Sequence, residues 1–155
     1  MKVIASIDDA LGSVGAELGV SEWLKIDQAR IDAFAEATGD HQWIHVDDAR
    51  AKAESPYGTT IAHGLLTLSL IPALSKQCFV VVNTKMGINY GLNKVRFIAP
   101  VPVGSRLRVR SALDDVSRIN DSTVHLTVRH TVEVDGNDKP AALAEMIGRY
   151  VFADS

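Results

Sequence analysis

Ionisable side chains gather around a glycine in the first third of the chain. Asp40 follows Gly39 directly, His45 lies five residues later, and His63 and Gly64 stand at the head of an apolar run. A carboxylate and an imidazole are side chains that commonly transfer protons near neutral pH. On a helix, five residues would turn Asp40 and His45 about 140° apart. Acid–base chemistry by this pair therefore requires a bent loop, and the glycine supplies the break.

Two short helices are expected to hold this loop from either side. Asp27 is a typical N-cap, and the apolar spacing that follows predicts a helix that ends at Thr38, just before the glycine. Asp47 can cap a second helix that runs through Ala53, where the turn residues 55–58 end it. Both ends of the loop are thus fixed by helix caps.

The run Thr60–Leu74 reads TIAHGLLTLSLIPAL and is apolar on nearly every side. It is too long for an ordinary buried strand, so it predicts a helix enclosed by other elements, which Pro72 should kink or end. Beyond it the periodicity changes to that of strands, each bounded by turn residues. The expected strands are Phe79–Val82, Lys85–Tyr90, Asn93–Ile98, Arg106–Val116, Thr123–Val134 and Ala142–Phe152, with a shorter one at Val20–Ile26.

The connections between the long strands are hairpin turns, at residues 120–121 and 136–138. Parallel strands would need a dozen or more connecting residues, so the sheet is expected to be antiparallel. A helix that is apolar all round is best buried if such a sheet curls around it. The sequence therefore predicts an α+β protein, with a curved antiparallel sheet of five to six strands around a long central helix, in a single domain over residues 1–155.

Composition limits the classes of partner and the compartment. With a net charge of −3 and a pI near 5.9, the chain lacks the excess of basic residues that nucleic-acid binding requires. The single cysteine, Cys78, excludes an internal disulfide, and the first ten residues lack the apolar run of a signal peptide or membrane anchor. We therefore expect a cytoplasmic protein, and the open edges of the sheet predict a homodimer.

Three arginines alternate along one expected strand, at Arg106, Arg108 and Arg110. They share one face of the sheet. A solvated strand face is the favoured interpretation, and a site for an anionic ligand group is the alternative.

The motif at Gly39-Asp40-x-x-x-Ile44-His45-x-Asp47, followed by Ala62-His63-Gly64, resembles that of the MaoC-like dehydratases and R-specific enoyl-CoA hydratases. The strands after the expected central helix, at residues 89–97 and 100–104, resemble the NodN-like branch of that family. The resemblance covers residue 20 to the end. Gln42 and Trp43 stand where the family has Asn-Pro, and Pro72 stands where some hydratases place a helix serine.

This resemblance implies a hot dog fold and the addition of water to a trans-2-enoyl-CoA to give the (R)-3-hydroxyacyl-CoA. It implies that Asp40 and His45 are the catalytic pair and that Gly64 contributes a backbone N–H to the thioester carbonyl. No metal and no cofactor are implied beyond the coenzyme A of the substrate, and the family usually forms dimers. Two other functions stay open, an acyl-CoA thioesterase and a non-catalytic module that binds acyl thioesters.

Each candidate residue also has an alternative interpretation. Asp40 could be a capping residue, and His45 a core histidine that is bonded to the backbone. The histidines and carboxylates near the loop could bind a metal ion, although a bent loop lacks the regular i, i+4 spacing of helical ligands. His63 is expected to fix the loop by a hydrogen bond, and His130 to be a satisfied buried histidine.

Overall fold

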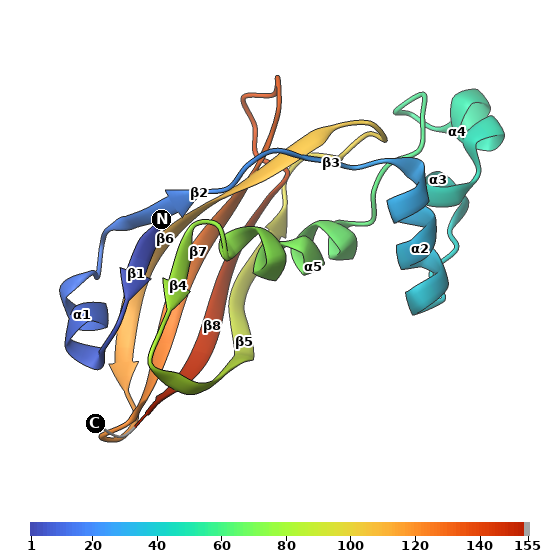
Figure 1. Cartoon of the computed structure of the whole chain (residues 1–155). Coiled ribbons are helices and arrows are strands. Elements are labelled where there is room, and N and C mark those ends of the chain that lie inside the picture. The colour runs from blue at the N-terminus through green and yellow to red at the C-terminus, as the bar shows by residue number, and fades with distance from the viewer. Residues whose placement is uncertain (154–155) are drawn as a thin grey trace.

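A six-stranded antiparallel sheet curves around one central helix in the computed structural model, which describes residues 1–153 (Figure 1). The strands are hydrogen-bonded in the order β2-β6-β7-β8-β5, and β3 also pairs with β6. They span β2 Glu17–Val20, β3 Leu24–Lys25, β5 Thr84–Phe97, β6 Arg106–Arg118, β7 Thr123–Val134 and β8 Ala142–Phe152. The predicted α+β class and antiparallel sheet are confirmed.

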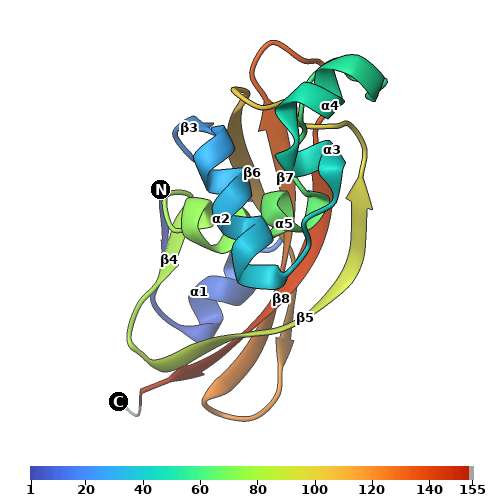
Figure 2. The same ribbon diagram turned by 90° about the vertical axis from the view of Figure 1, so that its right-hand side faces the viewer.

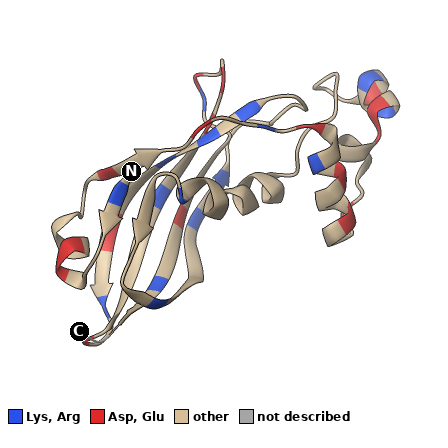
Figure 3. Ribbon diagram, in the orientation of Figure 1, with Lys and Arg blue, Asp and Glu red and all other residues tan. Residues whose placement is uncertain are grey.

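Helix α5, Gly64–Ser75, lies against the concave face of the sheet and carries no charged residue (Figure 3). Leu66, Leu70, Ile71 and Leu74 are buried in a core cluster with side chains of β6, β7 and β8. Burial of side chains of this size stabilises the fold by about 1.5–3 kcal/mol each. Among residues 1–153, no helix is long and apolar enough to cross a membrane.

The boundaries of this helix differ from those predicted. The helix begins at Gly64 instead of Thr60, because the preceding residues are extended and Ile61 forms an isolated bridge with Pro102. Pro72 lies inside the helix and does not end it. A proline removes one helical N–H, and the helix continues to Ser75, whose hydroxyl donates to the Pro72 carbonyl (3.2 Å). We attribute the continuation to tertiary packing of the last turn, where Leu74 and Ser75 are buried.

Strands β7 and β8 have the predicted boundaries, and the even-numbered residues of β7 from Val124 to Val134 are all buried. The two strands predicted at residues 85–90 and 93–98 are instead one strand, β5. Its pairing with β8 shifts register between Asn89 and Gly91 and between Leu92 and Val95. These irregularities coincide with the interruption in the alternating pattern that had predicted two strands.

The first residues of the chain close one end of the structure. Strand β1, Lys2–Ile4, pairs in parallel with β4, Phe79–Val81, and helix α1, Ile7–Gly12, lies beside it at the end of the sheet distant from α2 (Figure 1). Ile4, Ile7 and Ala10 belong to a second core cluster with residues of β6 and β7. Residues 1–19 have only weak periodicity, which predicts no more than a lead-in with one helical turn, so the sequence does not indicate the structural importance of this segment.

Three helices lie beyond the N-terminal end of α5. They are α2 Gln28–Thr38, α3 Trp43–Val46 and α4 Asp48–Glu54. Figure 2 shows α2 crossing in front of α5, with α3 and α4 following at the same end of the molecule. The predicted caps are confirmed, since the Asp27 side chain accepts from Arg30 N and the Asp47 side chain accepts from Arg50 N.

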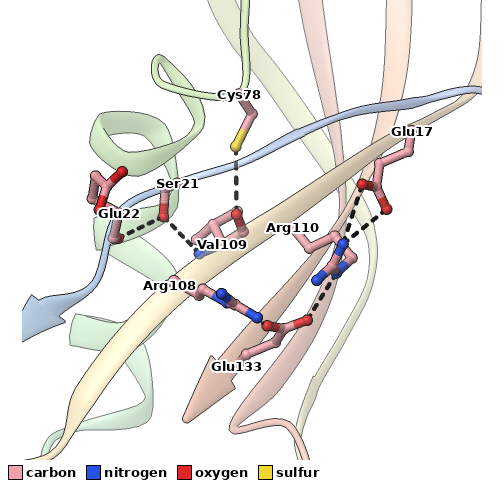
Figure 4. A network of polar contacts seen from close by, with 8 residues as sticks. All are labelled: Glu17, Ser21, Glu22, Cys78, Arg108, Val109, Arg110 and Glu133. Atoms are coloured by element: carbon pink, nitrogen blue, oxygen red, sulfur yellow. Dashed lines mark hydrogen bonds and ion pairs between the residues drawn. The ribbon is translucent and has the colours of Figure 1, made fainter. Parts of the chain in front are cut away.

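The arginines of β6 are bound by carboxylates on neighbouring strands. Glu133 accepts from Arg108 Nε (2.6 Å) and Arg110 Nε (2.8 Å), and Arg110 also reaches Glu17 (Figure 4). Arg106 pairs with Asp135. Such cross-strand pairs stabilise a sheet by about 0.2–1 kcal/mol each. They account for the alternating arginines without an anionic ligand.

His130 lies on the buried face of β7, and its Nδ1 is 2.9 Å from Ser111 Oγ. It is the satisfied buried histidine that the strand pattern predicted. Burial lowers the pKa of His130 to about 4. The unfolded chain, with an ordinary pKa near 6.5, takes up this proton first as the pH falls, so the native state loses stability between about pH 6.5 and pH 4.

We therefore expect the stability advantage of wild type over His130→Gln to shrink by roughly 3 kcal/mol between pH 7 and pH 4. Urea unfolding of both proteins across this pH range measures the difference in their free energies of unfolding. The contributions of the other titrating groups are the same in both proteins and cancel in this difference. A difference that stays constant with pH would contradict the assignment.

Candidate active site

The bend that follows α2 brings the candidate residues together. Gly39 ends the helix in the left-handed conformation (φ 78°), and its N–H donates to the Ala35 carbonyl (2.8 Å). A residue with a side chain is strained at this φ, so glycine is favoured here. The chain then turns into α3, a single helical turn that carries His45 and that the sequence pattern had not indicated. The predicted bend is present, with this short helix inside it.

Asp40, His45 and His63 each offer a carboxylate oxygen or a ring nitrogen, and these three atoms all lie within 4.8 Å of one another. The two histidines are buried, at 7% and 3% exposure, whereas Asp40 is exposed. The imidazole rings are stacked, with centroids 3.9 Å apart and an interplanar angle of 23°. A carboxylate and two imidazoles are thus concentrated at one point beside the start of α5.

Hydrogen bonding fixes the tautomer of His45. Its Nδ1 is 2.7 Å from the carbonyl oxygen of Ile61, and a carbonyl can only accept, so Nδ1 carries the proton. Nε2 is left with a lone pair that can accept a proton. Burial lowers the pKa of His45, and His63 adds to this effect, while the Ile61 carbonyl and Asp40 oppose it. The unprotonated ring, which is the form that can act as a base, is therefore favoured near neutral pH.

Asp40 is held by its own turn. Its Oδ1 accepts from Gln42 N (3.3 Å), and its backbone N–H donates to Thr38 Oγ1 (3.4 Å). The turn is of the Asx type, in which a carboxylate bonds to the backbone two residues on. This contact fits the capping interpretation of Asp40, yet it occupies one carboxylate oxygen only. The other oxygen is free to accept from a water molecule or a substrate.

Gly64 is the first residue of α5, and its backbone N–H and that of Leu65 have no acceptor among residues 1–153. Unpaired amides at a helix N-terminus, together with the helix dipole, attract an oxygen that carries negative charge. A Cβ on Gly64 would lie 3.0 Å from the ring of Phe97, so a larger residue would require that ring to move. Because Gly64 has no side chain, the Phe97 ring can lie beside the first amide of α5 without a clash.

A cavity of about 330 Å³ adjoins the start of α5. Its lining includes His45, Gly64, Thr67 and Phe97. Asp40 is exposed and is not part of this lining. A larger cavity, of about 500 Å³, lies near the other end of α5, and its lining includes none of Asp40, His45 and Gly64. The smaller cavity is therefore the one in which a ligand could meet both His45 and the start of α5.

Gln28 supports the bend and was not predicted from the sequence. Its Nε2 donates to the backbone carbonyl of His45 (2.8 Å), and its Oε1 accepts from Thr60 Oγ1 (2.6 Å). The side chain thus links the first turn of α2 to α3 and to the segment that leads into α5. A residue that acts through backbone contacts leaves no periodic signal, and only its place next to the cap Asp27 could have drawn attention to it.

Replacing Gln28 by Ala is expected to lower the free energy of unfolding by about 1–3 kcal/mol, because Thr60 and the His45 carbonyl each lose a partner. Chemical denaturation measures the loss. Asp32→Ala is the matched control, because Asp32 also accepts from Gln28 Nε2 but does so in an exposed contact. Equal stability of the Gln28 variant and wild type would contradict the supporting role.

The three ligand-type groups are poorly arranged for a metal ion. An imidazole binds a metal along the lone pair in its ring plane, at about 2.0–2.1 Å. Stacked rings direct their lone pairs side by side and not toward a common point. The Nδ1 of His45 is also occupied by the Ile61 carbonyl, and the Nε2 of His63 by the Asp40 carbonyl (3.0 Å). This donor set suits proton transfer better than metal binding.

Comparison with known proteins identifies the family. The model of the MaoC like domain matches residues 9–135. The chain is 54% identical to 3-hydroxyacyl-thioester dehydratase Z of Mycobacterium tuberculosis, over 97% of this chain and 99% of that protein. It is 46% identical to nodulation protein N of Rhizobium leguminosarum bv. viciae, over 92% and 89% of the two chains.

A solved structure supports the fold. The R-hydratase of Pseudomonas aeruginosa in its unliganded form superposes with a TM-score of 0.68 at 24% identity, over 92% of this chain and 83% of that one. The predicted resemblance, including its NodN-like branch, is confirmed. The chain belongs to the MaoC-like dehydratase family and has the hot dog fold.

Proposed function

We propose that this protein reversibly hydrates a trans-2-enoyl-CoA to the (R)-3-hydroxyacyl-CoA, with Asp40 and His45 as the acid–base pair and Gly64 at the thioester carbonyl. One observation carries the proposal. The Asp40 carboxylate lies within 4.8 Å of the His45 imidazole, whose Nε2 is free, and His45 lines the same cavity as Gly64, the first residue of α5, whose amide is unpaired. The name of the relative from Mycobacterium tuberculosis, a 3-hydroxyacyl-thioester dehydratase, supports the same reaction class.

The chemistry requires a water molecule, two proton transfers and a place for negative charge. The pair removes a proton from water as its oxygen bonds to the β-carbon, and electrons of the double bond move toward the thioester oxygen. The pair then delivers a proton to the α-carbon, so that water is added in full and no cofactor is consumed. Each positioned acid–base group contributes about 10²–10⁴-fold to the rate. The order of the two transfers within the pair is left open.

The start of α5 provides for the negative charge. The free amides of Gly64 and Leu65 are already oriented, so an enolate oxygen placed there needs no rearrangement of the protein. A donor of this kind is worth about 2.7–4 kcal/mol in the transition state. This is comparable to the contribution of an acid–base group.

The experiment follows the conjugated double bond and the thioester in the same sample. Loss of enoyl absorbance with crotonyl-CoA or longer enoyl-CoAs, without release of free thiol, supports hydration. Thiol release trapped by a chromogenic reagent would indicate a thioesterase instead. Binding of the thioester without either reaction would indicate a non-catalytic module. Chiral analysis of the product tests the (R) configuration.

The protein is further proposed to act as a homodimer that pairs along β5, one of the two edges of the sheet. An unpaired edge strand offers backbone groups to a second copy. Apolar side chains are exposed along this strand and just beyond it, at Met86, Ile88, Tyr90, Leu92, Phe97 and Ile98. Phe97 and Ile98 also line the smaller cavity, so a partner there would lie next to the site.

Replacing Ile88 by Lys is expected to shift the protein toward monomer in sedimentation equilibrium. Ile119→Lys is the control, because Ile119 is similarly exposed but lies outside the β5 edge, just after β6. A monomeric wild-type protein, or an Ile88 variant that dimerises as wild type does, would contradict pairing along β5.

A further inference from the structure

His63 contacts both members of the proposed pair without using a reactive atom of either. Its ring stacks on the ring of His45, and its Nε2 lies 3.0 Å from the backbone carbonyl of Asp40. On another side, its ring is 5.0 Å from that of Phe34. It precedes Gly64 directly, at the N-cap position of α5. One buried side chain therefore connects the Asp40 turn, the His45 ring and the start of the central helix.

The hydrogen bonding of His63 fixes its tautomer and leaves its other ring nitrogen without a partner. The Asp40 carbonyl can only accept, so the proton is on Nε2 and Nδ1 keeps a bare lone pair. That Nδ1 is the one buried side-chain nitrogen or oxygen without a partner in the described part of the chain. An unsatisfied buried polar atom costs about 1–3 kcal/mol, which an apolar aromatic residue at this position would avoid. Packing alone does not explain a histidine here.

We propose that His63 is a positioning residue that sets the Asp40 carboxylate and the His45 ring in fixed relation to each other. The stacked ring limits rotation of the His45 imidazole about its side-chain bonds, and the Nε2–H···O bond anchors the turn that presents Asp40. This inference rests on the proposed hydration. Displacement of a reacting group by about 1 Å can lower a rate 10²-fold. His63 itself touches neither water nor substrate in this role.

Two substitutions separate the two contacts of His63. His63→Phe keeps an aromatic ring for the stack but lacks the donor to Asp40, whereas His63→Gln keeps an N–H near the position of Nε2 but lacks the ring. Each variant is expected to lower kcat about 10–100-fold with KM changed less than about 3-fold. His63→Phe is expected to unfold at the same temperature as wild type or higher, because the unpartnered nitrogen is gone. His130→Gln, a buried histidine on β7, is the control in which stability falls and kcat is unchanged.

A second readout does not depend on activity. In ¹⁵N-histidine NMR spectra of the wild-type protein, His63 should carry its proton on Nε2 only, and the Nδ1 proton of His45 should exchange slowly. In His63→Gln that His45 proton should exchange at least tenfold faster, because the stacked ring no longer holds the imidazole against Ile61. Both results support positioning.

The outcomes distinguish this inference from the proposed function. If wild type hydrates enoyl-CoAs and both His63 variants keep kcat within twofold, the inference is wrong and the function stands. If activity falls only in proportion to lost folded protein, the role is structural and the inference is again wrong. If wild type hydrates no enoyl-CoA, the proposed function fails, and unchanged His45 proton exchange in His63→Gln would overturn the positioning role independently.

Discussion

Asp40→Asn is expected to lower kcat for enoyl-CoA hydration by about 10²–10⁴-fold with little change in fold. An amide has nearly the shape of the carboxylate, and its oxygen can still accept from Gln42 N. It cannot take up and return a proton, so the turn survives while the chemistry is lost. Initial rates of absorbance loss with crotonyl-CoA measure the effect, and circular dichroism checks the fold.

A neighbouring carboxylate provides the control for this substitution. Asp48 is exposed on α4 and pairs with Lys52, so Asp48→Asn removes a negative charge near the site without touching the pair. Its rate should equal that of wild type. A rate for Asp40→Asn within twofold of wild type on every enoyl-CoA tried would remove Asp40 from the mechanism.

His45→Gln is expected to cause a loss of similar size, about 10²–10⁴-fold in kcat. Glutamine can place a polar group near Nε2, but it does not titrate and cannot keep the Nδ1 contact with Ile61. In wild type, activity should fall on the acidic side of the pH–rate profile, because the His45 ring cannot accept a proton once it is protonated. Burial holds the pKa of His45 below its ordinary value, so the midpoint should lie below about pH 6.5.

His41→Gln is the matched control, since His41 lies four residues away and its side chain is about half exposed beside Glu36. It should leave both kcat and the pH profile unchanged. If the His41 variant loses as much activity as the His45 variant, or if the acid limb persists in His45→Gln at an unchanged midpoint, His45 is not the titrating group.

The long strands and the central helix could be predicted because the pattern of their buried residues can be seen within each segment of the sequence. In β7, alternate side chains face the core, so the sequence shows the period of two from Thr123 to Val134. The segment at residues 1–12 was missed for the opposite reason. Ile4 and Ile7 are buried by contacts with β4 and the sheet, which are distant in sequence, and no local period marks them.

In the candidate site, too, some residues could be predicted from the sequence and others could not. The residue types and spacing of Asp40 and His45 indicated acid–base chemistry in a bend, and the structure brings both close to His63. The roles of the supporting contacts could not be predicted. Gln28 acts through the backbone of His45, and the stacking of His63 depends on how two separate segments meet at the start of α5. Such contacts follow from tertiary structure and leave no spacing pattern in the chain.

The parallel pairing of β1 with β4 has a consequence during synthesis on the ribosome. Residues 2–4 are made 77 residues before their partners at Phe79–Val81, as the pairing of Lys2 with Phe79 shows. At about 5–20 residues per second, this interval lasts roughly 4–15 s. Throughout it Ile4 and Ile7 lack the surfaces that later bury them. We therefore expect chaperones that bind exposed apolar residues to recognise the newly made N-terminal segment.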